Sequence, residues 1–341
     1  MTRLLQAMAG AHLGGAEAFF ERLAPALDRA GVDQCVVIRR DAGRAGRLRD
    51  AGIEPIQLSF GGRLDFATSR AMRREINAFD PDIVLGWMSR GARFCPRGRH
   101  VLAARLGGYY DLKYFRHCDH LVGNTQDIAD YLVKAGWPAA RTHYLPNFVE
   151  AAPAPAIDRA SFDTPADAPL LLALGRLHVN KAFDTLIAAL VALPTAWLWI
   201  AGEGPLRAEL GAQARVLGVY SRLRFLGWRH DMPALLAAAD ILVCSSRHEP
   251  LGNVVIEGWA HGRPVVATRS AGPASLIADG VSGLLADIDD APALAAALAR
   301  VIDSADLRAD LVDGGRAAYE ADFTEAAVVA RYLDFFERIR A

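Results

Sequence analysis

The sequence predicts an α/β protein built from two doubly wound parallel sheets. Three observations support this fold class. Short apolar runs alternate with helical patterns from end to end, this alternation occurs twice, and a Pro- and Ala-rich stretch without hydrophobic periodicity separates the two series. The chain has 341 residues, which is enough for two domains of ordinary size.

The alternation gives the expected elements in order. In the first half, the predicted strands are Leu4–Met8, Gln34–Ile38, Ile83–Gly86 and Leu121–Gly123. In the second half, they are Leu170–Leu174, Ala196–Ala201, Ile241–Cys244 and Pro264–Ala267. Helical patterns between them include Ala16–Ala30, Asp65–Phe79, Asp184–Ala192 and Leu206–Leu217.

The segment Glu150–Ile157, which is rich in Pro and Ala, is the expected linker between the two series. We therefore expect an N-terminal domain over residues 1–150 and a C-terminal domain over residues 158–324. The last segment, residues 325–341, has the pattern of an amphipathic helix.

Composition excludes several classes of protein. The chain is 52% hydrophobic and 23% charged, which is typical of a globular protein and not of a disordered one. Its four cysteines form no C-x-x-C pair, so neither a zinc site nor a disulfide framework is predicted. No apolar run reaches the roughly 20 residues of a membrane-spanning helix, and the first apolar run is too short for a signal peptide. We therefore expect a cytoplasmic protein.

Charge is unevenly distributed along the chain. Residues 1–150 contain 21 Lys and Arg against 16 Asp and Glu, whereas the rest of the chain is acidic. Seven of these cations fall close together: Arg90, Arg93, Arg97, Arg99, Arg105, Lys113 and Arg116. This pattern favours an anionic acceptor or an anionic membrane face, with a generic solvated surface as the alternative. No nucleic-acid-binding motif accompanies the charge.

Polar motifs follow three of the predicted strands in the second half. These motifs are Gly175-Arg176, Gly202-Glu203-Gly204 and Ser245 to Glu249. In doubly wound sheets, ligands bind at the carboxyl ends of the strands, so we expect the three motifs to meet at one sheet edge. Arg176 and Lys181 would bring two cations to that edge, where a pyrophosphate leaving group needs its charge neutralised.

The most informative stretch is Glu249-Pro-Leu-Gly-Asn-Val-Val-Ile-Glu257, in which two carboxylates stand eight positions apart. Glu249 is expected on a strand-to-helix loop and Glu257 about two turns into the helix. Pro250 and Gly252 suit a helix start with free backbone N–H groups, which attract phosphate. The two carboxylates can accept hydrogen bonds from sugar hydroxyls, so the combination indicates a sugar nucleotide as ligand.

The stretch resembles the E-x7-E signature of the retaining glycosyltransferases of family 4, which have the GT-B fold of two Rossmann-like domains. Further segments resemble the family's motifs in the same order: Gly14-Gly15-Ala16-Glu17, Gly175-Arg176-Leu177 with Asn180 to Asp184, Ala201 to Pro205, and Phe225 to Trp228. The resemblance is specific over residues 170–330 and looser over 1–150. It also implies that the last helix crosses back to the first domain.

The resemblance assigns roles to particular residues. Arg176 and Lys181 match the residues that hold the donor diphosphate, Glu249 the one that binds the donor sugar, and Glu257 the one that binds the ribose. The implied donor-binding set is Gly14, Gly15, Gly202, Glu203, Gly227, Trp228, Leu251, Gly252, Asn253, Val254 and Glu257. The family uses cations and helix ends in place of a metal, so neither Asp80-Pro81-Asp82 nor Asp287-Ile288-Asp289 is interpreted as a metal site, and no cofactor is expected.

Many family members carry a His or Asp that faces the anomeric carbon from the first domain. The matching loop here is expected at Arg105–Lys113, which has no histidine. Asp111 is the best candidate for this catalytic role, and a helix N-cap is its structural alternative.

The sequence thus predicts a retaining, metal-independent hexosyltransferase that uses a UDP- or GDP-sugar. The acceptor would be a glycan or glycolipid, such as the lipopolysaccharide core, at the inner face of the cytoplasmic membrane. Two alternatives remain open: a non-catalytic sugar-nucleotide-binding subunit, and a nucleotide-sugar epimerase of the same architecture.

Overall fold

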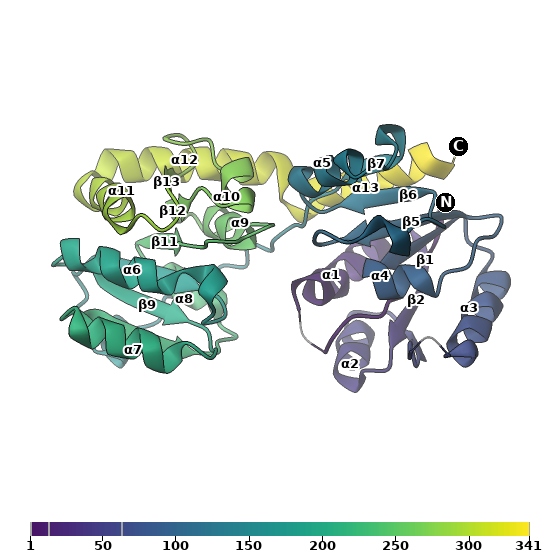
Figure 1. Ribbon diagram of the computed structural model, residues 1–341, viewed down its shortest axis with the longest axis horizontal. Helices are drawn as coiled ribbons and strands as arrows, with labels where there is room; N and C mark the ends of the chain where they lie inside the picture. Colours follow the sequence, from purple (N-terminus) through teal and green to yellow (C-terminus); the bar gives the residue numbers. More distant parts are fainter. Residues whose placement is uncertain (1, 13, 63, 341) are drawn as a thin grey trace. The chain divides into compact units, whose positions relative to one another are not determined.

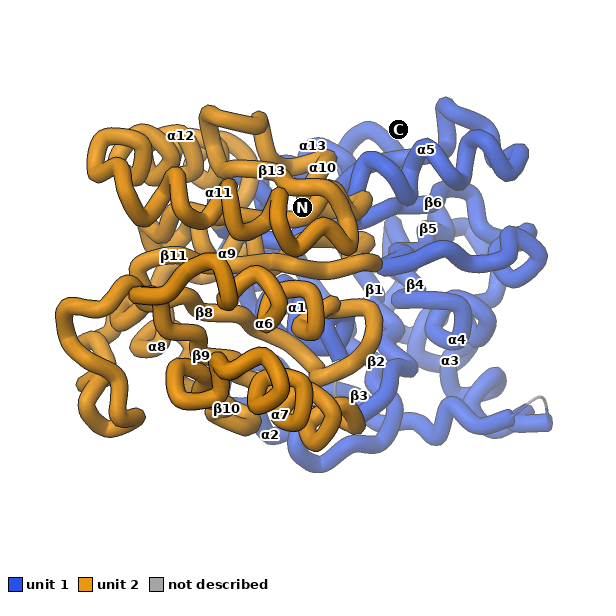
Figure 2. Tube along the Cα trace, turned by 60° about the vertical axis from the view of Figure 1, so that its left-hand side comes forward, with its two compact units in different colours: residues 1–148, 325–341 blue, residues 149–324 orange. Residues whose placement is uncertain are grey.

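The computed structural model describes residues 2–12, 14–62 and 64–340 (Figure 1). The chain divides into two compact units (Figure 2). Unit 1 comprises residues 1–148 together with residues 325–341, and unit 2 comprises residues 149–324. Across the described ranges, no helix combines the length and the hydropathy that crossing a bilayer requires.

Unit 1 is built on a seven-stranded parallel sheet with the strand order β3-β2-β1-β4-β5-β6-β7. Its strands are β1 (Arg3–Met8), β2 (Asp33–Arg39), β3 (Ile56–Leu58), β4 (Ile83–Trp87), β5 (Val101–Leu106), β6 (His120–Gly123) and β7 (Thr142–Tyr144). Its helices are α1 (Gly15–Arg29), α2 (Ala42–Asp50), α3 (Phe66–Phe79), α4 (Met88–Arg93), α5 (Gln126–Lys134) and α13 (Glu325–Arg340). Two 3-10 turns complete it, η1 (Leu112–Tyr114) and η2 (Ala139–Arg141).

Unit 2 is built on a six-stranded parallel sheet with the strand order β10-β9-β8-β11-β12-β13. Its strands are β8 (Leu170–Leu174), β9 (Trp197–Ala201), β10 (Leu223–Gly227), β11 (Ile241–Cys244), β12 (Val265–Thr268) and β13 (Leu284–Ala286). Its helices are α6 (Phe183–Ala189), α7 (Arg207–Val216), α8 (Met232–Ala238), α9 (Asn253–Ala260), α10 (Ala271–Leu276), α11 (Ala291–Asp303) and α12 (Ala305–Asp322). Its 3-10 turns are η3 (Arg159–Phe162), η4 (Val179–Lys181), η5 (Leu190–Ala192) and η6 (Tyr220–Arg222).

Each sheet is covered by helices on both faces, which explains the apolar runs. In β8, Leu170 and Leu172 pack into one core while Leu171 and Ala173 pack into the other. Every position of this strand is buried, so it reads as a continuous apolar segment without alternation. The prediction of two doubly wound parallel sheets is confirmed.

The strands that sequence reasoning missed are short or contain an arginine that is buried or half-buried. β3 and β7 each have three residues at a sheet edge. β10 contains Arg224, whose guanidinium stacks on Trp197 and donates to the Phe162 carbonyl. The segment expected to be a loop at 105–113 begins within β5 and ends in η1.

A buried cation links α13 to the sheet of unit 1. Arg105 in β5 is 1% exposed and lies between the rings of Phe19 and Trp87, 4.6 and 4.8 Å from their centroids. Its Nε donates to the Tyr332 hydroxyl of α13 at 2.7 Å, and its Nη2 donates to Asn147 at 2.5 Å. Since a buried charge is tolerated only when it is paired and hydrogen-bonded, α13 is part of the solvation shell of this cation.

Removing the Tyr332 hydroxyl should therefore destabilise unit 1. We expect Tyr332→Phe to lower the free energy of opening of the β5 amides by about 1.5–3 kcal/mol, because a hydrogen bond to a charged group contributes this much. Native-state hydrogen exchange measures this free energy. Tyr319→Phe is a matched comparison in unit 2, where the lost bond goes to the neutral Val149 carbonyl and should cost about 1 kcal/mol. Equal costs for the two variants would contradict this role of Arg105.

Candidate functional site

The loops that follow β8, β9 and β10 are joined by backbone hydrogen bonds at the carboxyl edge of the unit 2 sheet. Leu177 N–H, after β8, donates to the Glu203 carbonyl, after β9, at 2.9 Å. Gly202 N–H donates to the Gly227 carbonyl at the end of β10 at 2.8 Å. The expected convergence of the first two motifs is therefore observed, and Gly227 joins them.

Glycine is required where these loops touch. Gly202 has φ 152°, and a Cβ built on it would lie 1.9 Å from the Gly175 carbonyl oxygen. A Cβ on Gly204 would lie 2.4 Å from the Leu177 carbonyl oxygen. The motif glycines therefore serve backbone-to-backbone packing between neighbouring loops.

An ion pair connects the loop after β8 to the loop after β11. The Lys181 ammonium at the end of η4 bonds the Glu249 carboxylate, and their side chains are 22% and 14% exposed. The Ser245 hydroxyl donates to the Lys181 carbonyl at 2.9 Å. Burial lowers the pKa of Lys181, but neighbouring acidic groups, chiefly the Glu249 carboxylate, together raise the pKa above its ordinary value. Lys181 thus stays charged at neutral pH.

A second ion cluster in the same place was not found from the sequence. Arg247 bridges Asp184 at 2.6 Å and Asp289 at 2.5 Å and donates to the Val179 carbonyl. It fixes the η4 and α6 segment to the loop after β11. All three residues lie in segments that the sequence analysis names, Asn180 to Asp184, Ser245 to Glu249 and Asp287 to Asp289, but nothing in the sequence paired them.

The helix between the two glutamates begins later than expected. α9 starts at Asn253, with Gly252 as a left-handed N-cap at φ 75°, so Glu257 is its fifth residue and lies little more than one turn in, not two. The Glu249 carbonyl accepts from Gly272 N–H at 2.7 Å, and a Cβ on Gly272 would lie 2.6 Å from that oxygen. The start of α10 therefore holds Glu249 from the other side.

Three predicted residues present their side chains to solvent. Arg176 and Glu203 are exposed, and neither side chain has a hydrogen-bond or ion-pair partner among the described residues. Trp228 is 59% exposed. An unpaired cation that directly follows a buried strand is available to an anionic ligand.

The glycine loop of unit 1, residues 9–12 and 14–17, surrounds a carboxylate. Glu17 is 6% exposed and accepts from Ala11 N–H at 2.7 Å. A Cβ on Gly10 or Gly14 would lie 2.1 or 2.3 Å from a Glu17 oxygen, whereas Gly15 has open space around it. Gly14 is thus required by Glu17, and Gly15 is the glycine at which a ligand could approach the backbone.

Asp111 adopts the cap that was its structural alternative. Its carboxylate accepts from Lys113 N–H at 2.9 Å as the N-cap of η1 and pairs with the Lys113 ammonium at 2.6 Å. These hydrogen bonds to Lys113 lower the pKa of Asp111, which is about half exposed. An ionised carboxylate of this kind accepts hydrogen bonds and does not donate them.

The two D-x-D segments hold the structure together. Asp82 accepts from Arg3 N–H at 2.8 Å, and Asp289 pairs with Arg247. Within residues 2–12, 14–62 and 64–340, no group of three or more His, Cys, Asp or Glu side chains is arranged to hold a metal ion.

Comparison with known proteins identifies relatives over the whole chain. Residues 13–152 match the model "Glycosyltransferase Family 4", and residues 168–304 match "Glycosyl transferases group 1". The lipopolysaccharide core biosynthesis glycosyltransferases LpsE and LpsD of Rhizobium meliloti are 39% and 36% identical, over 94% and 95% of this chain and 95% of each relative.

A solved structure confirms the class of fold. HepE of Anabaena, crystallised with UDP and glucose, superposes with a TM-score of 0.83 at 20% identity and covers 99% of this chain and 100% of its own. The predicted GT-B class is therefore correct.

The close contact at Gly202 should be visible in stability. We expect Gly202→Ala to destabilise unit 2 by more than about 3 kcal/mol. The cost of backbone strain at a positive φ and the cost of the collision between the new Cβ and the Gly175 carbonyl are both included in this value. Gly218→Ala is the matched control: its φ is 71°, but a Cβ there meets nothing within 4 Å, so only about 1–2 kcal/mol of backbone strain remains. Hydrogen exchange of the β8 amides measures both variants, and similar losses would refute the steric argument.

Proposed function

The chain belongs to the glycosyltransferases, and from that premise we propose that it moves a hexose from a nucleoside-diphosphate sugar to an acceptor hydroxyl with retention of configuration. One observation carries the proposal. Arg176, which is exposed and has no partner among the residues that the structure describes, and a charged Lys181 paired with Glu249 stand on loops at the carboxyl edge of the unit 2 sheet. Such an edge receives a ligand whose diphosphate needs cations and whose sugar needs acceptors.

In this proposal each group of the site has one task. Arg176 and Lys181 neutralise the diphosphate as the glycosidic bond breaks, Glu249 accepts from the hydroxyls of the sugar, and Glu257 accepts from those of the ribose. The backbone of the β9 and β10 loops, the start of α9 and the glycine loop of unit 1 complete the donor-binding set: Gly14, Gly15, Gly202, Glu203, Gly227, Trp228, Leu251, Gly252, Asn253 and Val254. No cofactor or metal takes part.

The groups available support retention without a covalent intermediate. The Glu249 carboxylate is already paired with the Lys181 ammonium, so it is better suited to accept hydrogen bonds than to attack as a nucleophile. We propose that the acceptor oxygen attacks the anomeric carbon on the face that the phosphate leaves. The bond from that carbon to the phosphate oxygen breaks, and the departing phosphate takes the acceptor proton. Asp111, capped and paired with Lys113, would assist from unit 1 only as an ionised acceptor of hydrogen bonds.

The acceptor is proposed from the relatives. LpsE and LpsD are named for lipopolysaccharide core biosynthesis, and they match nearly the full length of this chain. We propose a lipopolysaccharide core oligosaccharide or a related glycolipid as acceptor, and the cytoplasmic face of the inner membrane as the place of reaction.

A donor screen tests the function. Each UDP- and GDP-sugar is assayed for thermal stabilisation, since a ligand at 100 times its Kd adds roughly 2.7 kcal/mol. Transfer to core oligosaccharide is then followed by proton NMR, which should show the donor's anomeric configuration in the product. Stabilisation without hydrolysis or transfer would instead indicate a non-catalytic subunit, and interconversion of donor sugars would indicate an epimerase.

Arg176 and Lys181 should differ when they are replaced. Arg176→Gln should lower kcat on the order of 10²-fold, the scale of losing one preorganised charge, and leave the Tm unchanged because the side chain has no described partner. Lys181→Met should lower kcat and also the Tm, because Glu249 loses its partner. Normal turnover in both variants would show that neither cation meets the donor.

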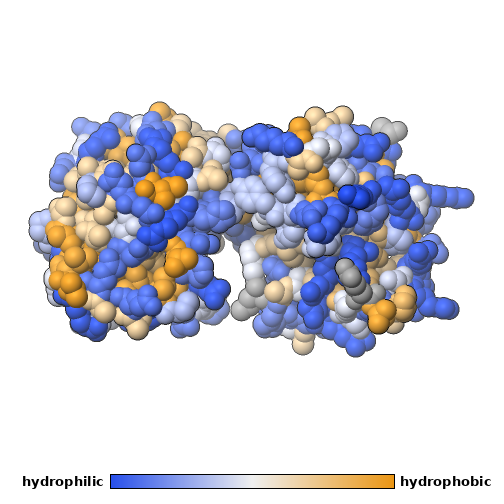
Figure 3. Space-filling view, in the orientation of Figure 1, coloured by the Kyte–Doolittle hydropathy of each residue, from blue (hydrophilic) through white to orange (hydrophobic). Residues whose placement is uncertain are grey.

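Three basic residues of unit 1, Arg73, Arg97 and Arg99, lie near the amino ends of its strands, away from the carboxyl edge of this sheet. Arg97 donates to the His117 and Arg116 carbonyls, and with Arg73 and Arg99 it lines a cavity of about 450 Å³ beside the amino ends of β4 and β5. Hydrophilic side chains cover most of the face of unit 1 shown in Figure 3. An acceptor at the carboxyl ends would not reach these cations, so we propose that they meet anionic lipid.

Vesicle binding checks this surface. Arg73 and Arg99 have no described partner, so Arg73→Ser/Arg99→Ser should lose about 1 kcal/mol per charge, or roughly 30-fold in partition onto anionic vesicles at low salt. Arg300→Ser/Arg316→Ser removes the same charge from unit 2 and should bind normally. Equal binding of the wild type to neutral and anionic vesicles would exclude an electrostatic membrane contact.

A further inference from the structure

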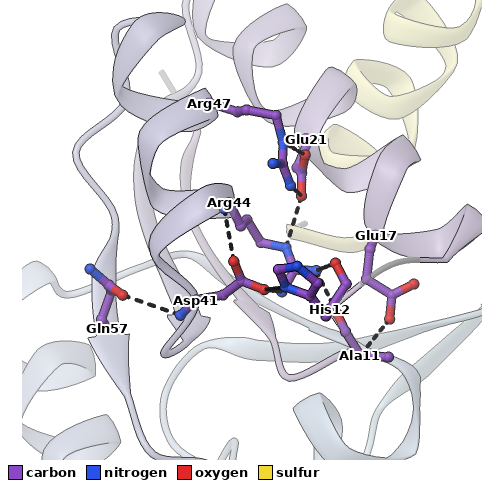
Figure 4. A network of polar contacts seen from close by, with 8 residues as sticks. All are labelled: Ala11, His12, Glu17, Glu21, Asp41, Arg44, Arg47 and Gln57. Atoms are coloured by element: carbon purple, nitrogen blue, oxygen red, sulfur yellow. Dashed lines mark hydrogen bonds and ion pairs between the residues drawn. The ribbon is translucent and has the colours of Figure 1, made fainter. Parts of the chain in front are cut away.

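We infer that Arg44 is a positioning residue for the glycine loop of unit 1. It would fix the loop in the conformation that meets the donor, and this inference rests on the proposed function. Figure 4 shows the contacts that support it, which come from α1, α2, β3 and the loop itself.

Arg44 lies on α2, its side chain is 1% exposed, and its guanidinium reaches the loop. Its Nη2 donates to the Ala11 carbonyl at 2.7 Å and to the His12 carbonyl at 3.4 Å. Its Nε donates to the Glu21 carboxylate of α1 at 2.9 Å. One guanidinium thus joins two helices to the first residues of the loop (Figure 4).

The Ala11 residue is held through both of its backbone polar groups. Its carbonyl accepts from Arg44, and its N–H donates to Glu17, the carboxylate that Gly10 and Gly14 surround. A change in the Arg44 contact would therefore be transmitted to Gly14, which precedes the glycine proposed to approach the donor.

A second contact fixes the same segment to α2. The His12 imidazole Nδ1 lies 2.7 Å from the carboxylate of Asp41, the N-cap of α2. The Asp41 backbone N–H donates to Gln57 of β3 at 3.3 Å. The loop is thus tied to a helix end whose own position is set by the sheet.

Stability alone does not explain a buried guanidinium here. Replacing a buried ion pair by apolar residues of similar volume is often neutral or stabilising, because the desolvation of both charges is avoided. An apolar side chain at position 44 could fill the space between α1 and α2, but it could not bond two successive carbonyls of the loop. The loop contact is what distinguishes arginine at this position.

Arg47 provides a matched control one turn along the same helix. It pairs with the same Glu21 through Nε at 2.6 Å and Nη2 at 3.0 Å, but its side chain is half exposed and donates to no carbonyl of residues 9–12 or 14–17. Arg47→Met removes an ion pair of Glu21 and leaves the loop contacts. In Arg44→Met, Glu21 keeps Arg47, so the fold should tolerate the change.

The experiment compares Arg44→Met, Arg44→Lys and Arg47→Met with the wild type by hydrogen-exchange mass spectrometry and by donor kinetics. We expect Arg44→Met to raise exchange at the Ala11 amide and its neighbours about 10-fold and to lower kcat/KM for the donor by about 10-fold or more, since small displacements of positioning groups are costly. Arg44→Lys should restore part of the exchange protection and part of the kcat/KM, because an ammonium can still donate to one loop carbonyl. Arg47→Met should change neither.

Each outcome decides between the explanations. Equal loop exchange in Arg44→Met and Arg47→Met overturns the positioning role and leaves a structural one. Faster loop exchange with normal kcat/KM overturns the link between loop and donor. If the wild type turns over no nucleotide sugar, the proposed function fails, while the exchange data still show whether Arg44 holds the loop.

Discussion

Neighbouring loops at the carboxyl edge of the unit 2 sheet pack backbone against backbone, and the side chains of the candidate site are placed by that contact. The α-carbons of Gly202 and Gly204 rest against carbonyl oxygens of the β8 loop, and Gly272 rests against the carbonyl of Glu249. At such distances no side chain fits between the loops. Main-chain geometry therefore sets where the backbones of Arg176 and Glu249 stand, and the Lys181 and Arg247 ion pairs add side-chain links between the loops.

The glycine loop of unit 1 is organised in another way. Its contacts are made by side chains, with Glu17 on one side of the Ala11 peptide and Arg44 on the other. Backbone packing leaves no room for a side chain, whereas the loop contacts of unit 1 depend on two buried charged side chains, and the loss of either one leaves its Ala11 partner unpaired. A single side-chain substitution can therefore release the unit 1 loop, while the unit 2 edge is sensitive to substitution at its glycines.

Sequence reasoning reached the fold class and the edge of the sheet where the motifs gather, because strands buried on both faces leave apolar runs and parallel strands end together. It failed where an arginine is buried or half-buried. Arg44, Arg105 and Arg224 read as surface residues, and their partners Glu21, Tyr332 and Trp197 lie far away in the chain. The Asp111 cap and the later start of α9 depend on local geometry that spacing alone does not determine.

The hydrogen bond between Arg105 and Tyr332 has a consequence for the order of folding during synthesis. Domains generally fold as units and from the N-terminus onward as the chain emerges from the ribosome. Unit 2 is continuous, from residue 149 to 324, and can complete its core as soon as it has emerged. Unit 1 must wait for α13, since until then the Arg105 Nε lacks its Tyr332 acceptor and the apolar surface of α1 that α13 covers is open. The half of the protein that is translated first is therefore the half that finishes folding last.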